Sequence, residues 1–94
     1  MTVGVLWTGS NAADAAQAAY FRGFLVDERE EVASELARSR ARLREVVEGD
    51  SVVGLRAMAR ARFDVRESEA KHNELNRLIS ALDRRFSAIW STDG

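Results

Sequence analysis

Val47-Glu48-Gly49-Asp50-Ser51 lies at the middle of a 94-residue chain that contains no proline. Gly49 can adopt a positive φ at little steric cost, which suits the residue just past a helix end. Asp50 and Ser51 are good N-cap residues, because their side-chain oxygens accept hydrogen bonds from the free N–H groups of a new helix. Long helix-permissive segments lie on both sides. The stretch therefore predicts the bend of an antiparallel two-helix hairpin.

The fold class that follows is all-α, a coiled-coil-like hairpin within a single domain. Residues 1–9 are apolar and strand-like, so we expect a short extended segment that packs on the hairpin, pairs with another copy or adds to a partner's sheet. The predicted boundaries are an extended segment over 1–9, a helical hairpin over 10–90 with helices over 10–48 and 51–89 and a bend at 49–50, and a tail over 91–94.

Composition excludes several classes of protein. Hydrophobic residues make up 46% of the chain and charged residues 31%, which is typical of a soluble folded helical protein. The net charge of −1 gives no bulk signal for an acidic or basic partner. Cysteine is absent, which excludes disulfides and thiolate metal sites. Lys71 is the only lysine, and this arginine bias suggests a GC-rich, bacterial genome.

Neither a signal peptide nor a membrane span is visible. Residues 2–7 lack a basic leader and are too short for a signal sequence. Nothing approaches the run of about 20 apolar residues that spans a bilayer. We expect a cytoplasmic protein without membrane contact.

Apolar residues recur at steps of three and four along both arms, as in a coiled-coil seam. Arg29 and Ser39 interrupt the seam of the first arm, and Ser68 and His72 interrupt that of the second. The first seam contains Leu25, Val32, Leu36, Leu43 and Val46. The second contains Met58, Ala61, Val65, Leu75, Ile79, Leu82, Phe86 and Ile89.

Each arm also carries a second stripe, which a two-helix hairpin cannot bury. Its small residues would let another helix approach closely, so we predict a C2 homodimer that forms a four-helix bundle. The alternative is a monomer with scattered surface alanines, which are good helix formers. The predicted dimer interface contains Ala19, Gly23, Val26, Ala33, Ala37, Phe63 and Ala70.

Reflecting the chain about the bend brings the polar interruptions of the two seams together. His72 then lies opposite Glu28 and Arg29, and Leu25 lies opposite Leu75. The first interpretation is a polar layer that fixes the register of the helices, with His72 hydrogen-bonded or ion-paired to Glu28.

The second interpretation is a metal site. Glu69-Ala70-Lys71-His72 is a Glu-x-x-His step, which places a carboxylate and an imidazole on one helical face. With Glu28 or Glu31 from the first arm, it resembles the ligand set of hairpin-type ferritin-like proteins. That resemblance implies a di-iron or other divalent metal site at a dimer interface. Our leading expectation is a protein without a cofactor.

Arginines gather near the bend on both arms. We select Arg38, Arg42, Arg56 and Arg60 as an electrostatic patch. One interpretation is a contact surface for a phosphate backbone, and the other is a solvated helical face with ion pairs between the arms. Phe63 alone interleaves with these arginines, so base stacking has little support.

Aromatic residues converge at the open end of the hairpin. We expect Phe21, Phe24 and Phe86 to form a small core there. Aromatic side chains are also enriched at interface hot spots. The predicted partner-binding residues are Trp7, Tyr20, Phe24 and Trp90.

Trp7-Thr8-Gly9 spells a W-x-G motif, and the chain has the length and hairpin shape of the secreted W-x-G proteins. In that family the motif occupies the bend, whereas here it precedes the first helix, so we assign no relationship. With one histidine and no cysteine, conventional acid–base or nucleophilic catalysis is not expected. The sequence favours a non-enzymatic interaction module or small subunit of a larger protein assembly. A di-metal protein and a nucleic-acid-binding arm are the alternatives.

Overall fold

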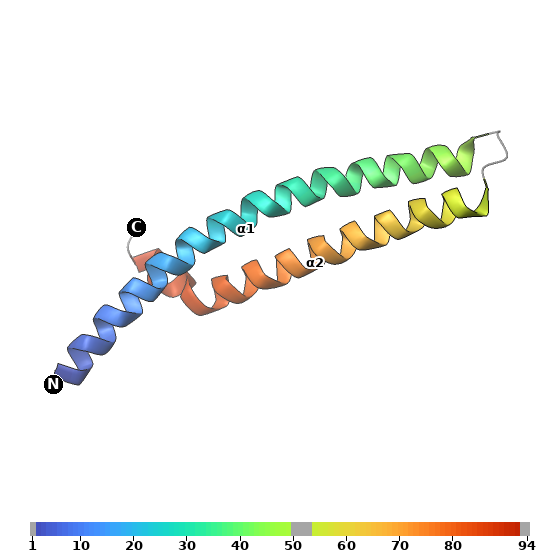
Figure 1. Ribbon diagram of the computed structural model, residues 1–94. Helices are drawn as coiled ribbons and strands as arrows, with labels where there is room; N and C mark the ends of the chain where they lie inside the picture. Colours follow the sequence, from blue (N-terminus) through green and yellow to red (C-terminus); the bar gives the residue numbers. More distant parts are fainter. Residues whose placement is uncertain (1, 50–53, 93–94) are drawn as a thin grey trace.

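The structure is a computed structural model that describes the backbone of residues 2–49 and 54–92, and the side chains of 12–49 and 54–91. Its two helices, α1 (Thr2–Glu48) and α2 (Leu55–Thr92), run antiparallel and pack against each other (Figure 1). The part of the chain described contains no strand. The predicted all-α helical hairpin is confirmed.

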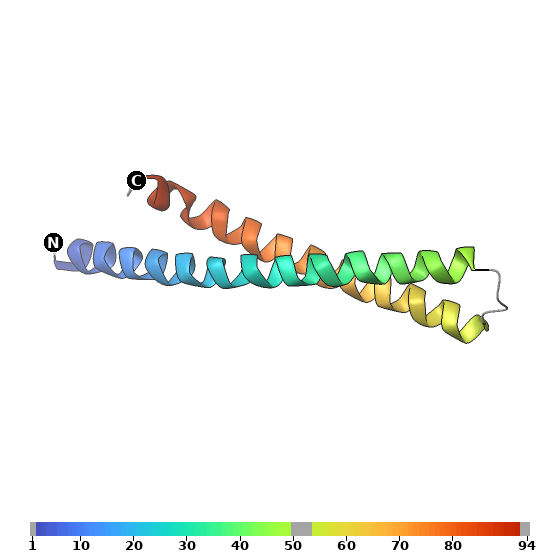
Figure 2. The ribbon, with the colours of Figure 1, turned by 90° about the horizontal axis from the view of Figure 1, so that it is seen from above.

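The hairpin is a single layer, elongated to 74 × 22 × 15 Å. Viewed from above, the helices cross at a shallow angle, as coiled-coil helices do (Figure 2). Among the described residues, none of the larger side chains is completely buried. The protein therefore has one seam of packed side chains in place of a globular core.

Both predicted seams form the contact between the helices. Leu25, Val32 and Leu36 of α1 are 3–7% exposed, and Leu43 and Val46 are half-buried. On α2, the buried seam residues are Ala61, Ser68, Ile79 and Phe86, and the half-buried ones are Met58, Val65, His72, Leu75, Leu82 and Ile89. The heptad spacing thus identified the buried face of each helix.

The bend is longer than predicted. α1 ends at Glu48 as expected, and the Gly49 N–H donates to the Glu45 carbonyl at 2.9 Å. α2 begins at Leu55 and not at residue 51, so that boundary was wrong. Gly54 supplies the first carbonyl, which accepts from Ala57 and Met58. Two β-branched valines and this glycine are poor helix formers, whereas good ones follow at once. The predicted caps Asp50 and Ser51 lie outside the described residues.

The N-terminal segment is helical, so the extended conformation predicted for residues 1–9 was wrong. α1 begins at Thr2, and its first turns project beyond the end of α2 (Figure 1). Gly4 and Gly9 each disfavour a helix by about 1 kcal/mol relative to alanine, but no proline blocks the backbone hydrogen bonds. α2 also runs to Thr92, past the predicted end at residue 89.

The longer bend shifts the register of the arms by about one helical turn. Arg29 contacts Asn76, where reflection about residues 49–50 placed His72 opposite it. The predicted facing pair of Leu25 and Leu75 moves apart by the same step. Connection length sets this register, because every added residue displaces all pairs along the arms.

Candidate functional site

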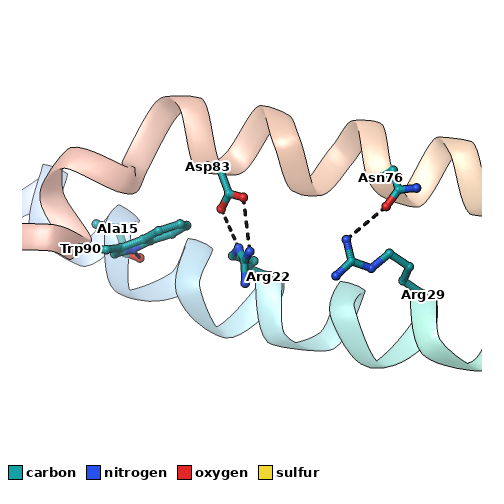
Figure 3. A network of polar contacts seen from close by, with 6 residues as sticks. All are labelled: Ala15, Arg22, Arg29, Asn76, Asp83 and Trp90. Carbon is teal, nitrogen blue, oxygen red and sulfur yellow. Dashed lines mark hydrogen bonds and ion pairs between the residues drawn. The ribbon is translucent and has the colours of Figure 1, made fainter.

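The open end of the hairpin has a small core, built around Phe86. Phe86 is 5% exposed and packs with Ala15 and Ala18 of α1. Trp90 stacks on Phe86 with ring centroids 5.8 Å apart, and its Nε1 donates to the Ala15 carbonyl at 3.0 Å (Figure 3). Trp90, predicted to bind a partner, is therefore half-buried and joins the end of α2 to α1.

Three other aromatic side chains of this end are exposed. Tyr20 is 82% exposed, Phe24 65% and Phe21 51%. The core assignment of Phe21 and Phe24 was wrong, because the seam of α1 passes through Arg22 and Leu25 instead. A shift of one residue rotates a side chain by about 100° around a helix, away from α2. We refer to Tyr20, Phe21 and Phe24 as the aromatic ridge.

Arg22 occupies a seam position beside the ridge and pairs with Asp83. Its Nε and Nη2 donate to the two carboxylate oxygens of Asp83 at 2.6 and 3.2 Å (Figure 3). These hydrogen bonds raise the pKa of Arg22 and lower the pKa of Asp83. The side chains remain 37% and 40% exposed, so solvent screens the pair. The guanidinium takes the place of an apolar side chain in the seam while its charge reaches water.

A polar layer does cross the middle of the hairpin, but with different partners from those predicted. Arg29 Nη1 donates to Asn76 Oδ1 at 3.1 Å (Figure 3). The Asn76 amide nitrogen lies 3.3 Å from His72 Nδ1, which accepts in the tautomer protonated at Nε2. The predicted register placed His72 opposite Glu28 and Arg29. In the structure Asn76 takes that place and contacts Arg29.

These contacts follow a heptad column that the sequence reasoning missed. Asn76, Asp83 and Trp90 recur every seventh residue of α2, and Arg29, Arg22 and Ala15 recur likewise on α1. The signal was present as a column of polar or amphipathic residues that flanks the apolar seam of α2. Such flanking positions carry the interhelical polar contacts of coiled coils.

The candidate metal ligands are engaged in other contacts or stand apart. Glu69 accepts from Arg40 at 3.2 Å, and His72 contacts Asn76. Glu28 and Glu31 are exposed on α1. Within the described residues, no group of three or more histidine, aspartate or glutamate side chains could hold a metal ion. The described part of a single hairpin does not form the predicted metal site. A metal site shared between two copies at a dimer interface stays a prediction.

The arginine patch is partly neutralised within the hairpin. Asp64 lies 3.7 Å from Arg42 and 3.5 Å from Arg60, so one carboxylate serves two members of the patch. Arg38 and Arg56 form no ion pair with the described residues. A hollow of about 260 Å³ beside Arg38 is also lined by Glu35, Ser39, Arg42, Asp64, Glu67, Ser68 and Lys71, a lining of mixed charge.

The predicted dimer stripe is solvent-exposed in the single chain. Val26 is half-buried, and Phe63 is 57% exposed. A Cβ added at Gly23 would meet nothing within 4 Å, so packing in the hairpin does not require a glycine there. The remaining exposed members are Ala19, Ala33, Ala37 and Ala70.

Two open hollows flank the aromatic ridge. One of about 580 Å³ lies between the helices and is lined by Asp14, Gln17, Ala18, Phe21, Arg85 and Phe86. The other, of about 500 Å³, lies on α1 and is lined by Ala19, Tyr20, Arg22, Gly23, Phe24, Val26 and Asp27. The Trp7 side chain, another predicted partner contact, falls outside the described side chains.

Comparison with known proteins yields no relative: no family model, no curated protein and no solved structure matches the chain. Over the residues described, neither helix combines the length and apolar character needed to cross a membrane. The interpretation of function therefore rests on the surfaces of the hairpin itself.

Proposed function

We propose that this protein is a non-enzymatic helical interaction module that binds a partner protein through the aromatic ridge. One observation carries the proposal: Tyr20, Phe21 and Phe24 are 82%, 51% and 65% exposed within five consecutive residues of α1. Single exposed apolar residues need no explanation, but clustered ones mark interaction surfaces. Aromatic residues are also the most enriched type at binding hot spots.

The size of the ridge suits the centre of an interface. An aromatic side chain offers about 150–250 Å², so the three exposed fractions together present about 400 Å². That area lies within the range of about 300–600 Å² for the largest, often functional, patch on a monomer. A stable interface buries about 800 Å² on each partner, so the ridge would supply its apolar centre and neighbouring residues its rim.

The hollow beside Phe21 indicates what kind of partner fits. Phe21 and Phe86 supply apolar walls, and Arg85, Gln17 and Asp14 supply polar groups at its border. An amphipathic helix could insert an apolar side chain there while an acidic residue approaches Arg85. The partner we propose is therefore a protein that presents an apolar helical face with a flanking carboxylate.

The test compares partner capture by matched variants. A Phe21→Ser/Phe24→Ser double variant removes two of the three side chains of the ridge. Leu55→Ser removes a similarly exposed apolar residue, 88% exposed, at the other end of the hairpin. We expect quantitative mass spectrometry of captured proteins to show one partner lost by the double variant and retained by Leu55→Ser. That partner, once purified, should bind the wild type in calorimetry. Equal recovery by all three proteins would contradict the proposal.

We further propose that the module self-associates through its exposed small-residue stripe, most simply as a C2 dimer with four helices. The stripe lies on α1 and α2 outside the hairpin seam, and Ala33, Ala37 and Ala70 leave room for another helix to approach. Gly23 supports this, because a mid-helix glycine costs about 1 kcal/mol and no contact in the single chain requires it.

A second candidate function is nucleic-acid contact near the bend. The observation in its favour is that Arg38, Arg44 and Arg56 form no ion pair within the described part of the hairpin. Phosphate contacts would make affinity fall steeply with salt. Fluorescence anisotropy with mixed-sequence duplex DNA at low ionic strength tests it, and the absence of binding there would remove this candidate.

A further inference from the structure

Charges on the exposed surface of α1 are segregated along its length. Residues 27–35 carry exposed carboxylates, and their one arginine, Arg29, is turned into the seam. Residues 38–44 carry arginines and no carboxylate. The acidic stretch contains Asp27, Glu28, Glu30, Glu31 and Glu35, and the basic stretch contains Arg38, Arg40, Arg42 and Arg44.

The hairpin neutralises these stretches only in part. None of the five carboxylates forms an ion pair with any described residue. On α2, Glu69 Oε2 lies 3.2 Å from Arg40 Nη2, and Asp64 Oδ2 lies 3.7 Å from Arg42 Nη1. Arg38 and Arg44 form no ion pair with the described residues. Like charges three or four residues apart repel one another along a helix. The arrangement destabilises an isolated α1, and a complementary surface would relieve that repulsion.

A face of small residues joins the two stretches. Ala33 lies within the acidic stretch and Ala37 lies between the two stretches. Both are exposed, on the side of α1 that carries Glu30 and Arg44 at heptad spacing. Toward the N-terminus the same face reaches Gly23 and its hollow of about 500 Å³. Two such helices could approach closely at the alanines while their charged side chains extend past one another.

We infer that this face binds a second copy of the chain, with the two α1 helices antiparallel and Ala33 of one copy facing Ala37 of the other. This inference rests on the self-association proposed above and specifies its geometry. An antiparallel pair in this register places Glu30 beside Arg40 of the second copy, and Asp27 beside its Arg44. A parallel pair would place carboxylate on carboxylate and arginine on arginine, so the charge pattern selects the antiparallel dimer.

The same register accounts for the hollow at Gly23. Val47 is 57% exposed, and in the antiparallel pair it lies opposite Gly23 of the second copy. Its side chain would enter the hollow next to Tyr20, and two-fold symmetry repeats the contact at the other end. Tyr20 and Phe24 also line this hollow, so in the dimer the partner protein would contact chiefly Phe21, which lines the hollow between α1 and α2 instead.

Charge reversal and its compensation test the geometry. Sedimentation velocity over a concentration series should show a wild-type dimer whose dissociation constant rises with salt. Asp27→Arg and Arg44→Glu should each weaken the dimer about tenfold or more, because each places like charges across the interface. The Asp27→Arg/Arg44→Glu double variant exchanges the two signs of one facing pair and should recover an affinity within about threefold of the wild type.

The control is Arg62→Glu, a charge reversal on exposed α2 at a residue with no described ion pair, which should leave the dimer unchanged. A wild-type protein that stays monomeric at every concentration would overturn both the geometry and self-association. A dimer that ignores salt, or a double variant weaker than either single variant, would overturn the geometry alone.

Discussion

Replacing Phe86 with alanine should cost more stability than the same replacement at Phe24. Phe86 is 5% exposed, stacks on Trp90 and lies under the Arg85 guanidinium, whose Cζ is 5.0 Å from the ring centroid. Phe24 is 65% exposed on the other helix. Both substitutions remove the same atoms and introduce the same good helix former, so the difference between them measures burial and packing.

The magnitude follows from the size of the deleted group. Buried Phe→Ala substitutions cost about 3–5 kcal/mol. The neighbours Leu82, Ile89 and Trp90 are only partly buried, so the cavity can collapse or fill with water, which favours the lower limit of about 3 kcal/mol. For a domain of this size that corresponds to a fall in Tm of roughly 12–24 °C. Phe24→Ala should change stability by about 0.5 kcal/mol or less.

Urea and thermal unfolding, followed by helical circular dichroism, measure both variants at dilute protein concentration. Tryptophan fluorescence, measured in a Trp7→Phe background so that it comes from Trp90 alone, should report the same transition, because the Trp90 ring stacks on Phe86. Equal destabilisation by the two substitutions, or a Phe86→Ala variant as stable as the wild type, would refute the assignment of Phe86 to the core and of Phe24 to the surface.

Three further substitutions test the polar contacts and the free face of α1. Asp83→Asn should lower the free energy of unfolding by about 0.2–1 kcal/mol at pH 7. Because pairing with Arg22 lowers the pKa of Asp83 in the folded state, this stabilisation is complete above the unfolded carboxyl pKa and is lost as pH falls through the folded value. The urea midpoints of variant and wild type should therefore converge in acid. Trp90→Phe keeps a stacked ring but removes the donor to the Ala15 carbonyl, and should cost about 0.5–1.5 kcal/mol in the same assay. Gly23→Ala should raise the free energy of unfolding of dilute protein by about 0.5–1 kcal/mol, because the new Cβ meets nothing within 4 Å.

Each of these has a contrary outcome. If the stability difference between Asp83→Asn and the wild type widens in acid, the Arg22 pair is not its cause. The pKa of Glu74 is also lowered, by hydrogen bonds from Arg77, but Glu74 is present in both proteins and its effect cancels in the difference. No loss in Trp90→Phe would remove the bond to Ala15 as a stabilising contact. Destabilisation by Gly23→Ala in dilute protein would show that the position is not open.

The amino-acid sequence was enough to predict the two helices, the end of the first at Glu48 and the buried face of each arm. These features follow from local signals: heptad spacing places apolar residues on one side of a helix, and a two-helix hairpin can bury only that side. No proline interrupts either arm. The N-terminal segment was predicted to be extended because β-branched residues favour extended chain, whereas the described part of the hairpin contains no strand with which it could pair.

The pairs of residues that meet across the seam became known from the folded hairpin. The start of α2 at Leu55 shifts the register by about one turn, and this replaces the predicted pairing of His72 with contacts from Arg29 to Asn76 and from Arg22 to Asp83. The sequence around Gly49 therefore predicted a hairpin, but it did not predict which residues of the two helices face each other. Side-chain periodicity specifies a face of a helix and repeats along it, whereas register depends on the path of the connection, which periodicity does not encode.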